Sequence, residues 1–549
     1  MADRTRAEAI RRPLKVKVVR AGLAPAAIDE ARRRVLSHPL VQRQVKRGRH
    51  RLLSLEPVEL EENKGARRSR TPGRHRATVF DYAQNRALLV EGSLGSGTRL
   101  TVKESGHQPR PTSEEFEAAI RLLARDPELG PQIEAKRLQP YPPMPPLVES
   151  EDNDAGRPER TIAVGLAPVG DRGRHEIVGV NLVRRRVVRF ERRAPAGVLA
   201  DDQLCGIPYA QESTTDGSFV AGEADVTVSR GNTVLWRFRV RRPAATKGPG
   251  LSTNGTGIEL RQVDYRGKRV LYRAHVPILN VKYEPGGCGA FRDWQNEEGK
   301  LHAVGTDVAP GFRLCSTPAT TILDTGSDKG NFLGVAIYVE GEEVVLVSEM
   351  EAGWYRYVCQ WRLHADGTIK PRFGFSAIQN SCVCNIHHHH AYWRFDFDIG
   401  TAGNNIVSEF NDPCLPAHAP AKWHQHLYEV QRPRDPIRSR KWRITNSKTK
   451  DCYELIPGRD DGIATKGSDW PFPRGDVWLL RYHPNEIDDG IAATGPPYAA
   501  NLAAFLNGEP IKNQDVVIWY GAHFTHDVQA EPPGVFGDIV GPTLTPISW

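Results

Sequence analysis

Four consecutive histidines lead into alternating bulky and charged residues in the stretch Asn385-Ile386-His387-His388-His389-His390-Ala391-Tyr392-Trp393-Arg394-Phe395-Asp396-Phe397-Asp398. In an extended strand, side chains two positions apart share a face, so His387 and His389 can present two imidazoles to one metal ion. Histidine is the commonest metal ligand near neutral pH, and a His-x-His pair on a strand suits copper or zinc. A low-complexity tract without a metal is the alternative. A third ligand from elsewhere in the chain would favour the metal site.

The positive charge of the chain is concentrated near its N-terminus. The formal net charge is +8, and residues 1–50 contain 14 Lys and Arg against 4 Asp and Glu. The remaining residues carry 60 basic and 62 acidic side chains. A basic arm can contact nucleic acid or anionic lipid, but this one lacks aromatic residues between its charges for stacking on bases. We therefore expect a solvated helix face there and no nucleic-acid partner.

The sequence shows no sign of a membrane or secreted protein. No apolar run is long enough to span a bilayer, and the N-terminus lacks the apolar centre of a signal peptide. Eight cysteines in 549 residues do not form a disulfide scaffold. These observations predict a soluble, cytoplasmic protein with no membrane partner.

Strand and helix patterns divide the chain into several units. Two successive N-terminal stretches each combine strands with a helix, and the helix comes first in both. In the second, Thr112 or Ser113 caps an amphipathic helix with a carboxylate in its first turn. After these units, strands recur between Gly, Pro, Asn and Asp residues, and helices nearly vanish. The predicted fold class is α+β and mainly β: two small α+β domains followed by a large antiparallel β-sandwich catalytic domain. The expected boundaries are 1–36 for a basic N-terminal arm, 37–106 and 107–200 for the small α+β domains, and 215–549 for the metal-binding β-sandwich.

A strand near the C-terminus delivers further histidines, in Trp519-Tyr520-Gly521-Ala522-His523-Phe524-Thr525-His526. With this strand, the chain resembles the copper-containing amine oxidases, which carry a quinone cofactor. That family has a His-x-His pair, then an Arg and an Asp-x-Asp run, and a third copper histidine near the C-terminus. The resemblance covers most of residues 37–549, and the copper ligands it implies are His387, His389 and His526.

Three neutral imidazoles suit Cu(II) and leave positions for water or dioxygen. His388 and His390 are expected on the opposite face of a regular strand. His523 is expected at the surface, at the end of its strand, rather than on the metal.

In the family, the Asp-x-Asp run and a later Asp form a peripheral site for a hard cation. Oxygen-only ligation suits Ca²⁺ or Mn²⁺. The alternative is a strand pair whose acids are neutralised by Arg394. The ligands implied by the resemblance are the carboxylates of Asp396, Asp398 and Asp515 and the backbone carbonyls of Phe397 and Val516.

The family derives its topaquinone from a tyrosine in the pattern Asn-Tyr-Asp/Glu. Tyr355 takes the place of that precursor, but Trp354 replaces the Asn and Arg356 replaces the acid. Strand alternation puts Tyr355 and Tyr357 on one face, and Trp354 and Arg356 on the other. The resemblance thus implies a topaquinone derived from Tyr355, with slow turnover because the neighbouring Asn is missing. An unmodified aromatic residue that points inward from its strand is the alternative.

A carboxylate is needed to take a proton from the substrate. Some family members carry Trp-Gln-Asn, a gate tyrosine, one more residue and the basic Asp. After Trp294-Gln295-Asn296, this sequence has Glu297 at the gate position and Gly299 at the base position. The candidates for the base are therefore Glu298, Glu297 and Asp293, and a solvated acid in a surface loop is the alternative for each.

The resemblance implies an enzyme that converts a primary amine, O₂ and water to an aldehyde, ammonia and H₂O₂, and that forms a homodimer. Cys315 resembles a family disulfide cysteine, but no cysteine lies between it and Tyr355, where its partner belongs, which agrees with a reducing compartment. Two alternatives stay open. One is a copper enzyme of the same fold with altered chemistry on unmodified Tyr355, and the other is a non-enzymatic metal-binding scaffold.

Overall fold

The fold is described from a computed structural model of the 549-residue chain. None of the helices in the described part of the chain is both long and apolar enough to cross a membrane. The structure describes residues 12–22, 25–45, 48–58, 64, 74–93, 100–105, 109, 111–141, 143, 147, 159–169, 176–189, 204–208, 222–243, 257–284, 290–292, 298–464, 475–484, 486 and 502–549.

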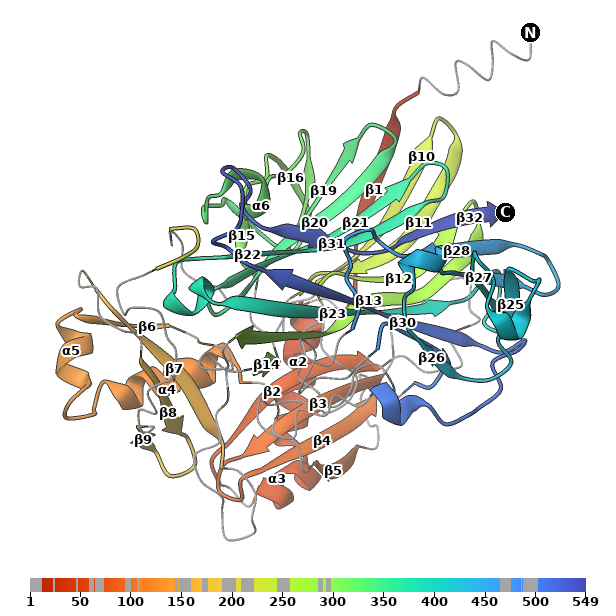
Figure 1. The fold of residues 1–549 in the computed structure, drawn as a ribbon. Coiled ribbons are helices and arrows are strands. Elements are labelled where there is room, and N and C mark those ends of the chain that lie inside the picture. Colours follow the sequence, from red (N-terminus) through yellow and green to blue (C-terminus); the bar gives the residue numbers. More distant parts are fainter. Residues whose placement is uncertain are drawn as a thin grey trace.

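Two large sheets face each other and form a β-sandwich (Figure 1). Among the described residues, one sheet has ten strands and the other has twelve. Neighbouring strands pair antiparallel in almost every case, with β17 and β19 parallel. The predicted β-sandwich is therefore confirmed. The first sheet contains β1 (Leu14–Ala21), β10 (Glu223–Arg230), β11 (Thr233–Arg241), β12 (Glu259–Tyr265), β13 (Lys268–Glu284), β14 (Ala290–Arg292), β23 (Ile386–Phe397), β26 (Val430–Arg432), β29 (Val477–Arg481) and β30 (Val516–His526).

The second sheet carries the strand of the predicted quinone tyrosine. Its members are β16 (Gly305–Ala309), β17 (Phe312–Cys315), β19 (Val335–Glu340), β20 (Glu343–Ala352), β21 (Tyr355–His364), β22 (Ile369–Ala377), β24 (Asn405–Phe410), β25 (Trp423–Gln425), β27 (Lys441–Asn446), β28 (Cys452–Ile456), β31 (Asp538–Val540) and β32 (Thr543–Ser548). A separate pair joins β15 (Lys300–Leu301) to β18 (Phe332–Leu333). Helices in this region are short, as predicted: α6 (Ile322–Thr325) and the 3₁₀ turns η4 (Ser381–Cys384), η5 (Pro416–His418), η6 (Pro436–Arg438) and η7 (Leu502–Phe505).

The hydrophobic core fills the space between the two sheets, where Trp361, Trp393 and Trp442 are fully buried. β23 is buried from His387 to its end. A second apolar cluster, which includes Trp478 and Trp519, packs against its other face. Because both faces of this central strand are covered, the histidines on both of its faces are buried.

The two small α+β domains lie on the same side of the sandwich (Figure 1). Each packs its helices on one face of a four-stranded antiparallel sheet. The helix that was predicted to start at Thr112 or Ser113 is capped by Thr112 in a capping box with Glu115. The first domain contains α2 (Pro25–Ser37), α3 (Pro39–Val45), β2 (His50–Val58), β3 (Arg74–Asp81), β4 (Arg86–Ser93) and β5 (Thr101–Ser105). The second contains α4 (Ser113–Leu123), α5 (Gly130–Glu134), β6 (Leu138–Tyr141), β7 (Thr161–Pro168), β8 (Glu176–Asn181) and β9 (Arg186–Val188).

The N-terminal residues are organised differently from the predicted basic arm at 1–36. Residues 14–21 form β1, which pairs with β10 at the edge of the ten-stranded sheet. Leu14, Val16 and Val18 alternate with charged residues and pack on the sandwich core, a strand pattern that the density of basic residues obscures. Helix α2 belongs to the core of the first small domain, which therefore begins near residue 25 rather than at 37.

Candidate copper and tyrosine site

Three predicted histidines meet between the sheets. β23 and β30 pair with His387 directly opposite His526. The ring centroid of His387 lies 4.6 Å from that of His526 and 5.1 Å from that of His389. One ring nitrogen of each histidine lies within 4.8 Å of those of the other two, and all three residues are buried. The structure thus brings the three predicted histidines together, whereas copper binding at this site is a proposal.

Hydrogen bonds determine which nitrogens face the centre of this cluster. His387 Nδ1 lies 2.7 Å from the carbonyl oxygen of Asn385, which can only accept, so Nδ1 carries the proton. His526 Nε2 lies 2.6 Å from the Glu531 carboxylate and carries the proton there. The other two nitrogens, His387 Nε2 and His526 Nδ1, are then unprotonated in neutral rings, and they lie 2.7 Å apart. Two lone pairs so close repel each other unless a positive charge lies between them.

His389 completes the donor set. Its ring is fully buried, and among the described residues neither of its nitrogens has a hydrogen-bond partner. An unsatisfied polar atom in the interior is costly, and a metal ion relieves that cost. Three imidazoles are a donor set that suits Cu(II), so the residues present fit copper.

Burial favours the neutral form of His387 and His389. Burial, followed by the neighbouring His526, lowers the pKa of His387 to about 3. Burial, followed by His387, lowers the pKa of His389 well below its ordinary value. Metals bind the neutral imidazole, so both rings are in the ligating form at neutral pH.

Tyr355 lies beside the histidines at the start of β21. Its ring centroid is 4.7 Å from that of His389 and 5.5 Å from that of His387. The ring of Tyr357 stacks on it, with the centroids 5.4 Å apart and the planes at 16°. Tyr355 and Tyr357 share one face of the strand, as predicted, and the structure turns that face toward the histidines.

The two unusual neighbours of Tyr355 behave differently from each other. Arg356 points to the opposite face, as predicted, where its guanidinium pairs with Asp328 at 2.9 Å. The same prediction for Trp354 is wrong. Trp354 precedes the strand, in a turn with Gly353 at φ 61°, so strand alternation does not govern it. Its indole N–H donates to the hydroxyl of Tyr283 at 2.7 Å, and the Tyr283 ring lies 5.2 Å from that of His387.

The candidates for the base are only partly described. Asp293 and Glu297 lie outside the described residues, together with Trp294–Asn296. Glu298 is fully buried, so the solvated surface acid that we considered as its alternative is wrong. Its carboxylate accepts hydrogen bonds from two guanidinium nitrogens of Arg242, one at 2.9 Å. Such a pairing stabilises the charged carboxylate and covers its oxygens, so Glu298 is an engaged rather than a free acid.

The predicted peripheral cluster holds a lysine. Asp396, Asp398 and Asp515 come together as predicted. The ammonium group of Lys64 lies 2.7 Å from Asp396 Oδ1, 2.6 Å from Asp515 Oδ2 and 3.6 Å from Asp398 Oδ1. Arg394, the predicted salt-bridge partner, approaches Asp396 only to 3.7 Å. Phe397 and Val516, whose carbonyls were the other predicted ligands, pair with each other in the β23–β30 ladder.

The other two histidines of the run, His388 and His390, lie on the other face of β23. His388 contacts Glu284 at 2.8 Å, and His390 contacts His523 at 2.9 Å, which confirms their predicted direction. The surface position predicted for His523 is wrong, because the residue is buried against Asp476 at 3.2 Å. Its direct pairing with His390 across the sheet brings it inside.

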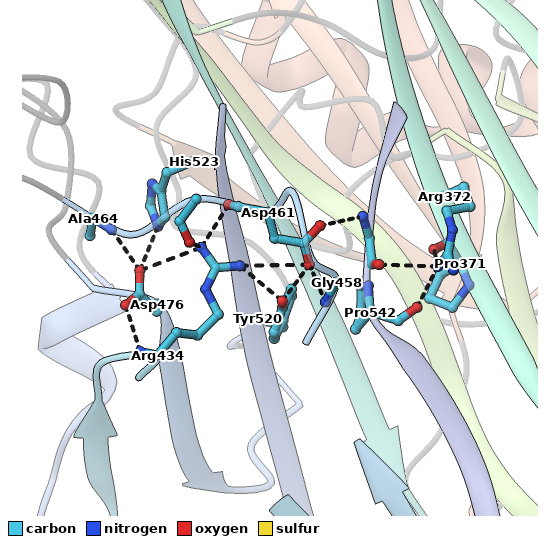
Figure 2. A network of polar contacts seen from close by, with 12 residues as sticks. Pro371, Arg372, Arg434, Gly458, Asp461, Ala464, Asp476, Tyr520, His523 and Pro542 are labelled. Atoms are coloured by element: carbon cyan, nitrogen blue, oxygen red, sulfur yellow. Dashed lines mark hydrogen bonds and ion pairs between the residues drawn. The ribbon is translucent and has the colours of Figure 1, made fainter. Parts of the chain in front are cut away.

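Figure 2 shows the polar network that extends from His523. Arg434 lies between Asp476 and Asp461, and its Nη1 donates to the Tyr520 hydroxyl at 2.8 Å. Tyr520 in turn donates to Asp461. The network is buried and anchors the middle of β30, the strand that carries His526.

A disulfide joins Cys205 to Cys384. Cys384 lies three positions before His387, and the Gln529 side chain donates to its carbonyl at 2.9 Å. Cys315 is a free, buried thiol, in agreement with its missing partner. Disulfides are typical of oxidising compartments, so the bond gives no support to the predicted cytoplasmic location.

Three residues that the sequence reasoning missed contribute to these sites: Tyr283, Glu531 and Lys64. Tyr283 pairs with His387 in the β13–β23 ladder. Its position near the end of a long strand could have predicted a buried aromatic residue there. Glu531 follows His526 by five residues, within reach of a ligand histidine. Lys64 carries no local signal, because its partners lie more than 330 residues away.

Comparisons with known proteins agree with this geometry. Residues 371–549 match the family described as copper amine oxidase, enzyme domain, and this segment contains all three histidines. No curated protein sequence matches the chain.

Several solved structures share the fold. A copper-containing benzylamine oxidase from Hansenula polymorpha superposes with a TM-score of 0.59 at 13% identity, over 96% of this chain and 97% of that one. A lysyl oxidase from Pichia pastoris gives 0.57 at 13% identity, over 98% and 92% of the two chains. An amine oxidase from Aspergillus nidulans gives 0.53 at 12% identity, over 96% and 88%. The resemblance to the copper-containing amine oxidases is thereby confirmed at low sequence identity: the chain has the fold of these structures over nearly its whole length, and residues 371–549 match the family's enzyme domain.

Proposed function

We propose that this protein is a copper-dependent oxidase that deaminates a primary amine with O₂ and water, giving an aldehyde, ammonia and H₂O₂. The enzyme-domain match supports amine oxidation in general. The observation that carries the finer proposal is the meeting of His387, His389 and His526 beside the ring of Tyr355.

The three histidines would hold copper through His387 Nε2, His526 Nδ1 and a ring nitrogen of His389. When bound, copper supplies the redox chemistry that converts Tyr355 to topaquinone and that assists reoxidation by O₂. Glu531 accepts the Nε2–H of His526 and so holds Nδ1 toward the centre. Asn385 does the same for His387 through its carbonyl.

The remaining contacts hold the Tyr355 ring in place. Tyr357 covers one side of it, and His389 meets it edge-on at 88°. Burial of Tyr355 to 2% exposure excludes bulk water from the ring. The base that takes a proton from the amine is proposed among Glu298, Glu297 and Asp293. For Glu298 this role requires that Arg242 release the carboxylate when substrate binds.

One observation favours a second candidate function. Trp354 places an indole, hydrogen-bonded to Tyr283, next to Tyr355, where the family has a small amide. A copper protein of the same fold with altered chemistry on unmodified Tyr355, or a metal-binding scaffold, fits that substitution.

Copper loading in air separates these functions. We expect mass spectrometry of the peptide that contains Tyr355 to show added oxygen, together with visible absorbance and O₂ uptake with primary amines. Tyr355→Phe is the matched control and should bind copper without gaining the absorbance. An unmodified Tyr355 peptide after full copper loading would contradict the quinone proposal and favour the second candidate.

The metal ligands have a separate test. Elemental analysis of His387→Ala/His389→Ala should show loss of stoichiometric copper, and His388→Ala should retain it. Full copper occupancy in the double variant would overturn the assignment. A homodimer is proposed on the resemblance alone, and a monomeric mass in light scattering would contradict it.

A further inference from the structure

The cluster of Asp396, Asp398 and Asp515 is built to neutralise a cation, and the structure supplies one from the chain itself. The Lys64 ammonium donates to Asp396 Oδ1 at 2.7 Å and to both oxygens of Asp515, at 2.7 and 2.6 Å. An ammonium group has three N–H donors, so these contacts use all of them. Asp398 Oδ1 lies at 3.6 Å and adds attraction without a direct hydrogen bond.

Aromatic rings close the remaining sides of the ammonium. Its nitrogen lies 3.5 Å from the ring centroid of Tyr482 and 5.2 Å from that of Tyr272. Both distances are in the range in which a ring face attracts a cation. Lys64 is only 7% exposed, so its charge is enclosed by carboxylates and rings together. Although burial alone favours the neutral amine, the three carboxylates raise the pKa of Lys64 above its ordinary value.

We propose that Lys64 replaces a divalent metal at this cluster, so that the chain binds neither Ca²⁺ nor Mn²⁺ there. A calcium ion needs six to eight oxygen ligands at about 2.3–2.6 Å, and the lysine nitrogen lies at that centre. A divalent ion beside the ammonium would also meet a like charge in a largely buried site. The proposal is independent of the function proposed at the copper site.

Lys64 also links two parts of the fold, which a metal ion at the cluster would not do. It lies in the chain between β2 and β3 of the first small domain. A free ion would join only β23 and β30, because Asp396 lies in β23, Asp398 follows it and Asp515 directly precedes β30. The lysine joins those strands to the first small domain, across 332 and 451 positions of sequence. The ion pairs of Lys64 therefore also hold the first small domain against the β-sandwich.

The proposal is tested on the copper-loaded full chain with Ca²⁺, Mn²⁺ and the luminescent probe Tb³⁺. Wild type should bind none of them at this cluster, by elemental analysis after equilibrium dialysis and by terbium luminescence sensitised through the nearby tyrosines. Lys64→Met, similar in size but uncharged, should bind Tb³⁺ and Ca²⁺ at least about tenfold more tightly than wild type, because it removes a buried positive charge. Adding Ca²⁺ should then raise its melting temperature.

Lys64→Arg is the matched control, since it keeps the positive charge and should bind no divalent ion. Stoichiometric Ca²⁺ or Mn²⁺ in wild type that Asp515→Asn removes would overturn the proposal, and this measurement stands even if Lys64→Met does not fold. A folded Lys64→Met protein that gains no affinity for Ca²⁺ or Tb³⁺ would overturn it as well.

Discussion

Replacing Glu531 should weaken copper binding without removing a ligand. The Glu531 carboxylate accepts the Nε2–H of His526 at 2.6 Å, and His526 is only 2% exposed. A hydrogen bond with one charged partner contributes roughly 1.5–3 kcal/mol. Since about 1.4 kcal/mol corresponds to a tenfold change in affinity, the expected loss is about 10- to 100-fold. Groups that orient metal-binding histidines show losses of that size.

Two variants separate the loss of the negative charge from the loss of the hydrogen-bond acceptor. Glu531→Gln keeps an acceptor but loses the charge, so it should lie near the smaller loss, and Glu531→Ala should lie near the larger one. Copper affinity is measured by competition with a chelator of known affinity, starting from copper-free protein. Asp527→Asn is the matched control, because it removes a carboxylate next to His526 that instead accepts from the backbone of Gln529. Unchanged affinity in Glu531→Ala would refute the reasoning.

Three further predictions concern stability. The Cys205–Cys384 disulfide closes a loop of 179 residues, and chain entropy predicts that losing it lowers the free energy of unfolding by about 5 kcal/mol. The melting temperature of Cys205→Ser/Cys384→Ser should therefore fall well below that of Cys414→Ser, the free-thiol control. Burial raises the pKa of Glu349 from 4.5 to about 8. The contribution of this carboxyl group to the free energy of unfolding is therefore fully present below about pH 4.5 and is lost as the pH rises to about 8. The melting temperature of Glu349→Gln relative to wild type should accordingly rise from pH 5 to pH 8, and a constant difference would contradict this. Arg356→Met removes the guanidinium that pairs with the buried Asp328 and should cost about 3–5 kcal/mol in denaturant unfolding, of which Arg356→Met/Asp328→Asn should recover part.

The alternation of side chains along the sequence predicted those features of the site that depend on a single strand. The shared face of His387 and His389, and that of Tyr355 and Tyr357, follow from side-chain alternation alone, whereas the direction of each face depends on how the sheets pack. The direction of Trp354 does not, because a turn interrupts the alternation one residue before the strand. The burial of His523 depends on the register of β23 against β30, which is a long-range pairing.

Contacts between distant segments could not be predicted from any pattern. Lys64 is one basic residue among many, and only the folded chain brings it to Asp396 and Asp515. The Cys205–Cys384 disulfide was equally unpredictable, because spacing alone does not select a pair among eight cysteines. The β-sandwich itself was predictable because its strands repeat a short-range signal many times.

The pairing of β1 with β10 makes the two small domains an insertion within the sandwich. Ala21, the last residue of β1, lies opposite Glu223, the first residue of β10. The described residues between them lie outside the ten-stranded sheet, and the chain leaves and re-enters that sheet at neighbouring backbone positions, which in an antiparallel pair are about 5 Å apart. A short turn could therefore replace the whole excursion and still leave a β1–β10 hairpin. Lys64 would be lost with it, so the sandwich left behind would have to take its peripheral positive charge from solution.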